Sequence, residues 1–136
     1  MTRDFPIINP ATEETVRHHS GIDAREAMRR IDASNAAWGQ WSGASLSDRG
    51  AVLLQAASIL DEDRNRWATR ITQEMGKPIT ESLAEVDKCA WVCRWYAQNT
   101  ESLLADEHYD IDTADVRLVR RPLGVLYAIM PWNFPL

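Results

Sequence analysis

The sequence predicts an α/β chain in which a helical region precedes two strands, and three observations support that order. Between residues 22 and 106, apolar side chains recur at steps of three and four, the period of amphipathic helices. Residues 116–120 alternate between apolar and charged side chains, as in a strand with one solvent-facing side. Residues 125–130 are apolar on both faces, which is typical of a central strand in a parallel sheet. Because such a sheet needs further strands, we expect the chain to be an incomplete part of its fold.

Residues 1–21 are expected to form an extended lead-in, in which Asn9 and Pro10 make a turn. The first helix follows directly. Asp23 can accept a hydrogen bond from the first helical turn, and Glu26 stands three residues later, so the two form a capping box.

A second helix is expected to begin near Ser45 and to bend in the charged run 61–64. It should end at Gly76, because glycine adopts the left-handed conformation that closes a helix, and Pro78 prevents continuation. A third helix is expected over 79–104, with an apolar stripe on one face.

Composition excludes several classes of function. The chain is 45% hydrophobic and 26% charged, with a net charge of −5, so binding to nucleic acid or to an anionic membrane surface is not expected. No stretch approaches the roughly 20 apolar residues that span a bilayer. The start of the chain lacks the apolar run of a signal peptide, so a cytoplasmic location is expected.

Cys89 and Cys93 lie four residues apart on the third expected helix. Neighbouring helical turns seldom bring two thiols into disulfide geometry, so both are interpreted as reduced core residues. No further Cys or His ligands lie near them in the sequence, and no metal site is expected.

The most informative stretch is the last one, Pro131-Trp132-Asn133-Phe134-Pro135-Leu136. It is a rigid, proline-bounded loop that carries one side-chain amide directly after the apolar segment 125–130. In open α/β sheets, ligands bind beyond the carboxyl ends of the strands, where an amide N–H can face a substrate oxygen. The same pattern also fits a purely structural loop asparagine.

Four motifs stand in order along the chain: Ile8-Asn9-Pro10-Ala11-Thr12; Glu74-Met75-Gly76-Lys77-Pro78 with Glu81 and Glu85; Arg121-Pro122-Leu123-Gly124-Val125; and Pro131-Trp132-Asn133-Phe134-Pro135. In this order they resemble the aldehyde dehydrogenase superfamily over nearly the whole chain. The Met-Gly-Lys-Pro form and the run Ile129-Met130-Pro131-Trp132-Asn133 look closest to the succinate-semialdehyde dehydrogenase branch.

The resemblance implies that residues 1–136 are the amino-terminal part of a Rossmann-like cofactor-binding domain with oligomerisation strands. Within it, 22–106 would be helical and 114–122 an oligomerisation-type strand. Residues 123–136 would be the first strand of the cofactor domain and its oxyanion loop. The complete enzyme would be a homo-oligomer, a dimer or a tetramer.

The resemblance also implies a chemistry. A Cys thiolate attacks a small-molecule aldehyde, NAD or NADP accepts a hydride, and a Glu-activated water releases the carboxylate. Asn133 matches the donor to the oxyanion, and Met130, Pro131, Trp132 and Asn133 match the loop along the nicotinamide nucleotide. The nucleophilic Cys and the general-base Glu have no counterpart here, so this chain alone is expected to be inactive.

Two alternatives stay open. Asp87 matches a position that contributes to a structural monovalent-cation site in some relatives, and it also fits an exposed helical carboxylate. The whole chain also fits a stand-alone helical interaction module from a degenerate gene, because such a module would show the same amphipathic helices.

Overall fold

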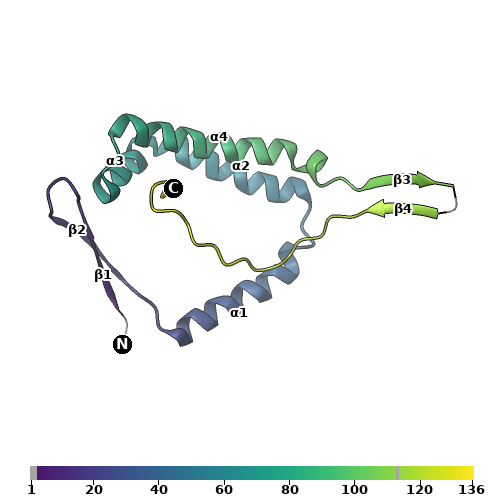
Figure 1. Cartoon of the computed structure of the whole chain (residues 1–136), viewed down its shortest axis with the longest axis horizontal. Coiled ribbons are helices and arrows are strands. Elements are labelled where there is room, and N and C mark those ends of the chain that lie inside the picture. Colours follow the sequence, from purple (N-terminus) through teal and green to yellow (C-terminus); the bar gives the residue numbers. More distant parts are fainter. Residues whose placement is uncertain (1–2, 113) are drawn as a thin grey trace.

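The computed structural model describes residues 3–112 and 114–136, which form four helices and two antiparallel hairpins (Figure 1). The predicted mixture of helix and strand is confirmed. In chain order the elements are β1 (Asp4–Ile8), β2 (Thr15–Ser20), α1 (Ala24–Trp41), α2 (Leu46–Glu62), α3 (Arg64–Met75), α4 (Ile79–Leu103), β3 (Glu107–Ile111) and β4 (Ala114–Leu118).

The helices begin and end where local signals in the sequence place them. Asp23 caps α1 by accepting a hydrogen bond from the Glu26 N–H at 2.8 Å, and Ser45 caps α2 in the same way. The charged run expected to bend the second helix divides it into α2 and α3 at Asp63. Gly76 closes α3 with a φ of 79°, the left-handed conformation predicted for it.

The core lies between α2, α3 and α4. Its buried apolar residues are Ala57 on α2, Ala68 and Ile71 on α3, and Val86 and Ala90 on α4. Most of these side chains are small, so the helix axes can approach closely. The third predicted helix therefore turns its expected apolar stripe inward.

Helices α2 and α4 approach each other closely at Gly50. A methyl group at this position would lie 3.3 Å from the carbonyl oxygen of Ala97, so glycine permits the contact. None of the helices in the described chain is long and apolar enough to cross a bilayer.

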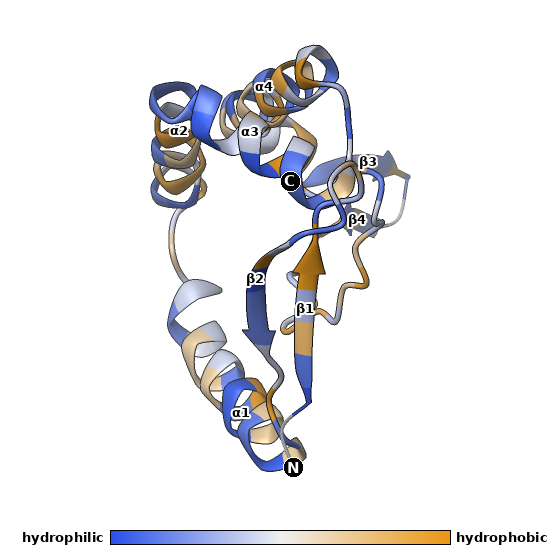
Figure 2. Cartoon of the chain, turned by 90° about the vertical axis from the view of Figure 1, so that its left-hand side faces the viewer, coloured by the Kyte–Doolittle hydropathy of each residue, from blue (hydrophilic) through white to orange (hydrophobic). Residues whose placement is uncertain are grey.

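Helix α1 stands apart from α2, α3 and α4 and carries both hydrophobic and hydrophilic residues (Figure 2). None of its residues is buried. Apolar side chains that recur at helical spacing along α1 stay largely open: Met28, Ile31 and Trp38 are between 38% and 56% exposed. The apolar face of α1 therefore has little to pack against within the described part of the chain.

The expectation of an extended lead-in at residues 1–21 is wrong in one respect, because most of this segment forms the hairpin β1–β2. Asp4 pairs with Ser20 and Ile7 with Arg17 in an antiparallel register. Both strands are largely exposed, so they carry no regular alternation of buried and exposed positions. Because that alternation is absent, the hydrophobic period of the sequence did not predict β1 and β2.

The expected strand over 114–122 forms only in part. β4 begins at Ala114, as predicted, but ends at Leu118, and it pairs with β3, which the sequence pattern did not reveal. Every described residue of this hairpin is exposed. The hairpin projects from the helical body (Figure 1).

Residues 125–130, predicted to form a central strand, are not a strand in the structure. The segment runs back between α1 and the helical body with no hydrogen-bonded neighbour among the described residues (Figure 1). Leu126 is 74% exposed and Ile129 83%. A strand exists only through its ladder of hydrogen bonds, and residues 3–112 and 114–136 supply no partner for this one.

Candidate functional site

The terminal loop, residues 131–136, returns to the helical body beside α3 and the start of α4 (Figure 1). Two charged residues meet it there. Lys77 lies in the short connection between α3 and α4, and Glu85 lies on the second turn of α4. The side chains of both residues are almost completely buried, with exposed fractions of 8% and 4%.

Lys77 and Glu85 form an ion pair that also binds the loop. The Lys77 ammonium donates to the Glu85 carboxylate and, at 2.8 Å, to the main-chain carbonyl oxygen of Asn133. The other carboxylate oxygen of Glu85 accepts the main-chain N–H of Leu136 at 3.1 Å. The ammonium also lies 4.2 Å from the centre of the Phe134 ring, a cation–π contact.

Local sequence explains why Lys77 occupies this position. Gly76 turns the chain sharply after α3. Pro78 has an extended backbone conformation, with its φ fixed by the ring, and directly precedes α4. Pro10, in the turn between β1 and β2, packs closely on Gly76: a methyl group added to Gly76 would lie 2.8 Å from the Cγ of Pro10. An Arg17–Glu74 ion pair joins the same hairpin to α3.

The structure fixes the main chain of Asn133 and leaves its side chain exposed. The side-chain amide makes no hydrogen bond to residues 3–112 or 114–136. Beside it is a pocket of about 500 Å³. The lining residues are Met75, Lys77, Glu81, Ala84, Glu85, Lys88, Trp132, Asn133 and Phe134. An amide in this position can donate an N–H to a ligand oxygen.

The other predicted site residues are open to solvent. Trp132 is 81% exposed and lines the pocket beside Asn133. Met130 is 69% exposed and, like Pro131, does not line that pocket. The structure therefore brings Trp132 and Asn133 together at one pocket, and Met130 and Pro131 are not part of its lining.

Cys89 is not an activated nucleophile. Burial, reinforced by the nearby Glu85 carboxylate, raises the pKa of its thiol above the ordinary value. Its Sγ lies 3.7 Å from the carbonyl oxygen of Leu136, to which it can donate a weak hydrogen bond. Cys89 and Cys93 are both free thiols, as predicted, but they are partly buried and are not the core residues that the sequence suggested.

Asp87 is an exposed helical carboxylate paired with Arg64, whose guanidinium donates to it at 2.7 Å. That hydrogen bonding lowers the pKa of the Asp87 carboxyl group. Among the residues that the structure describes, no group of three or more His, Cys, Asp or Glu side chains could hold a metal ion.

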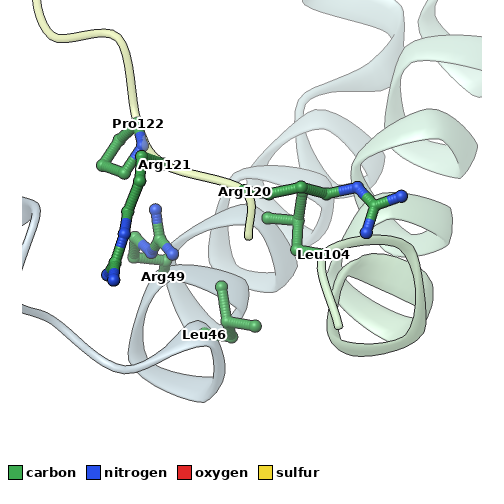
Figure 3. A pocket seen from close by; sticks show the side chains of 6 residues that line it. All are labelled: Leu46, Arg49, Leu104, Arg120, Arg121 and Pro122. Carbon is green, nitrogen blue, oxygen red and sulfur yellow. The ribbon is translucent and has the colours of Figure 1, made fainter. Parts of the chain in front are cut away.

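A second pocket, of about 250 Å³, lies at the far end of α4 (Figure 3). Its walls are Leu46, Arg49, Leu104, Arg120, Arg121 and Pro122. The Arg49 Nε is buried without a partner in the described chain, whereas Arg120 donates to the carbonyl oxygen of Ala105 at 2.7 Å. These six residues include no nucleophile and no carboxylate, and their charged groups are the guanidinium groups of Arg49, Arg120 and Arg121.

Reasoning from sequence identified Lys77 and Glu85 only as parts of a motif and missed their contact with the loop. One signal was present: a lysine directly after a helix-ending glycine, followed by a glutamate on the next helix. Their partners on the loop lie 56 and 51 residues away in the chain, and no local pattern reveals such a contact.

A family model described as "Aldehyde dehydrogenase family" matches residues 1–136. A probable succinate-semialdehyde dehydrogenase [NADP(+)] from Synechocystis is 41% identical over 128 residues, which cover 94% of this chain and 28% of the relative. Succinate-semialdehyde dehydrogenase [NADP(+)] 1 from Mycobacterium tuberculosis is 36% identical, with 95% of this chain and 29% of the relative covered.

Solved structures agree with these relatives. The succinic semialdehyde dehydrogenase of Streptococcus pyogenes in complex with NADP+ matches with a TM-score of 0.91 and 30% identity. That match covers 96% of this chain and 29% of the other. The chain thus spans less than a third of the length of the relatives it matches.

Proposed function

The chain belongs to the aldehyde dehydrogenase family, and on that premise we propose that it serves as the amino-terminal part of an NAD(P)-dependent enzyme that oxidises succinate semialdehyde. The observation that carries the proposal is Asn133, whose main chain is fixed by Lys77 while its amide stays open beside a pocket. The names of the Synechocystis and Mycobacterium relatives support the choice of aldehyde.

The proposed reaction converts an aldehyde, water and NAD(P)+ into a carboxylate, NAD(P)H and two protons. A thiolate from outside this chain adds to the aldehyde carbon, and the carbonyl electron pair moves to oxygen. Loss of a hydride from that carbon, to a nicotinamide that would be held along residues 130–133, would leave a thioester. Water, deprotonated by a carboxylate outside this chain, then releases the acid and returns the thiolate.

Asn133 would donate its side-chain N–H to the oxygen that becomes negative when the thiolate adds. A hydrogen bond of this kind strengthens as charge develops, so it lowers the barrier more than it stabilises the bound aldehyde. Fixing the donor beforehand adds to the effect, because no reorganisation is needed during the reaction. The hydrogen bond from Lys77 to the Asn133 carbonyl oxygen supports this idea, because it fixes the main chain that carries the amide.

The residues present fit one wall of a nicotinamide nucleotide site. Met130 and Trp132 offer exposed apolar surface, and the segment from Met130 to Asn133 would lie along the cofactor. When bound, the nicotinamide nucleotide would supply the hydride acceptor. Residues that hold its phosphates would come from outside this chain, since the segment carries no basic side chain.

The 136-residue chain by itself is proposed to be inactive, because both the nucleophilic Cys and the general-base Glu would lie elsewhere. The exposed β3–β4 hairpin is proposed to pair with another subunit in a dimer or tetramer. Its open strand edges are suited to such pairing. Under this proposal, a stand-alone interaction module is the less supported reading.

The test is a chimera in which this chain replaces the corresponding residues of the Synechocystis relative. Asn133→Ala should lower kcat for succinate semialdehyde by about 10²–10³-fold, the usual loss for one oxyanion donor. Affinity for NADP+ should change much less. Asn35→Ala, at an exposed position on α1, is the matched control and should leave kcat unchanged. A near-normal kcat in Asn133→Ala, with acylation or hydride transfer rate-limiting, would refute the role of Asn133.

A further inference from the structure

We propose that Lys77 and Glu85 are positioning residues that clamp the Asn133 loop by its main chain and so set the place of the Asn133 amide. The inference rests on the proposed function, because it concerns the donor assigned there. Neither residue touches the amide itself. Lys77 binds the carbonyl oxygen of Asn133, and Glu85 binds the N–H of Leu136.

The two contacts hold both ends of a four-residue segment. With Asn133 fixed at one end and Leu136 at the other, the main chain between them has little freedom to rotate. The clamp is itself rigid, because Lys77 and Glu85 are buried and paired with each other. A charged hydrogen bond of this kind is about twice as strong as a neutral one.

The same burial makes the clamp specific to these residue types. The Lys77 ammonium divides its donors between Glu85 and the Asn133 carbonyl, and its charge faces the Phe134 ring. Glu85 uses one oxygen for Lys77 and the other for Leu136. A buried ion pair does not by itself stabilise a fold strongly, since its desolvation offsets its attraction. Its contacts with the loop give this pair a further role.

Apart from the contact of the Phe134 ring with Lys77, side-chain anchoring of the loop within the described chain lies at the Leu136 end. Leu136 packs against the core residues Ala68, Ile71 and Val86. Trp132, at the other end, is 81% exposed. Loss of the clamp should therefore leave the helical core intact and free the Asn133 end of the loop.

The first test measures the motion of the loop in the 136-residue chain by ¹⁵N relaxation. With the clamp intact, the main-chain order parameters of Asn133 and Phe134 should be near 0.85, the value of rigid backbone. Lys77→Met keeps the aliphatic stem of the side chain but removes every hydrogen-bond donor. The order parameters of Asn133 and Phe134 should then fall below about 0.6, while Val86 and Ala90 on α4 stay rigid. Lys88→Met removes an exposed lysine that makes no hydrogen bond to the loop in the described chain, and should leave the order parameters of Asn133 and Phe134 unchanged.

Two outcomes of this measurement would overturn the clamp. In one, Asn133 and Phe134 are already mobile in the unsubstituted chain. In the other, Lys77→Met loosens α4 as much as the loop, which would give Lys77 a general structural role.

The second test uses the chimera described above. Lys77→Met should lower kcat by about 10–10²-fold, because a small misplacement of a catalytic group costs up to that much. The KM for the aldehyde should stay within a few-fold. In an Asn133→Ala background, Lys77→Met should have almost no further effect, since a positioning residue acts through the group it positions.

The two tests separate the clamp from the function. If Asn133→Ala lowers kcat but Lys77→Met leaves both kcat and loop motion unchanged, the clamp is refuted and the function stands. If Lys77→Met frees the loop but Asn133→Ala keeps full activity, the clamp holds the loop and the oxyanion role fails. Additive losses of kcat in the double variant would contradict the positioning role.

Discussion

Replacement of Gly76 by alanine tests the junction that places Lys77. Gly76 has a φ of 79°, in the left-handed region, and closes α3 by donating its N–H to the carbonyl oxygen of Thr72. An added methyl group would lie 2.8 Å from the Cγ of Pro10, in the turn of the β1–β2 hairpin. The change therefore introduces backbone strain and a steric clash together.

Both costs can be worked out roughly. The left-handed conformation costs a residue with a Cβ about 1–2 kcal/mol. A clash with a well-packed neighbour adds about 1 kcal/mol or more, because the Pro10 turn must move away from α3. The lower entropy of an unfolded alanine returns about 0.4–1 kcal/mol. The expected loss in the free energy of unfolding is therefore about 2 kcal/mol, a large part of the roughly 5–15 kcal/mol that holds a typical domain.

Urea denaturation of the 136-residue chain, followed by circular dichroism at helical wavelengths, measures the loss. Gly39→Ala is the matched control: the same methyl group meets nothing within 4 Å there, and Gly39 lies inside α1. The control should not lower stability, since alanine favours a helix interior over glycine by about 0.5–1 kcal/mol. Equal stability for Gly76→Ala and the unsubstituted chain would show that the junction tolerates a Cβ, and the reasoning would be wrong.

Three further predictions concern other parts of the chain. The isolated chain should self-associate through its unpaired apolar segment 125–130, and Leu126→Lys should shift its sedimentation toward the monomer. Ser47→Lys adds the same charge on α2 and should not cause this shift, and a monomeric unsubstituted chain would contradict the prediction. Iodoacetamide at pH 8.5 should alkylate Cys89 more slowly in the folded chain than in urea, as followed by peptide mass spectrometry, because burial raises the pKa of its thiol and lowers the thiolate fraction; equal rates would be the opposing result. Arg64→Gln should raise the pKa of Asp87, followed by NMR titration, toward the ordinary value of about 3.9. Because the pKa of Asp87 is depressed in the folded chain, the stabilisation from its pairing with Arg64 is present above the ordinary pKa and is lost as the pH falls through the folded pKa. High salt should weaken this stabilisation, since the pair is exposed. A pKa of Asp87 that does not move in Arg64→Gln would count against the pairing.

The sequence by itself determined the features that depend on near neighbours in the chain. The start of α1 at Asp23 and of α2 at Ser45 follows from a side chain three residues from the N–H that it caps. The end of α3 at Gly76 follows from the conformational freedom of one residue. The inward face of α4 follows from helical spacing alone. Family membership was likewise visible in short motifs, since each is a contiguous run.

Tertiary structure decided whatever depends on distant partners. Residues 125–130 have the composition of a buried strand, yet they are not one here, because a strand requires hydrogen bonds from another segment. The hairpin β1–β2 and the strand β3 were not predicted from the sequence, because neither strand pair buries one face.

The anchoring of Asn133 is the clearest case. Asn133 and its loop were identified from the sequence, but the main chain of Asn133 is held in place by Lys77, 56 residues away. Hydrophobic period and capping signals describe contacts within a few residues, whereas a buried ammonium selects its acceptors by proximity in space. Only the folded chain brings the Asn133 carbonyl within 2.8 Å of that ammonium.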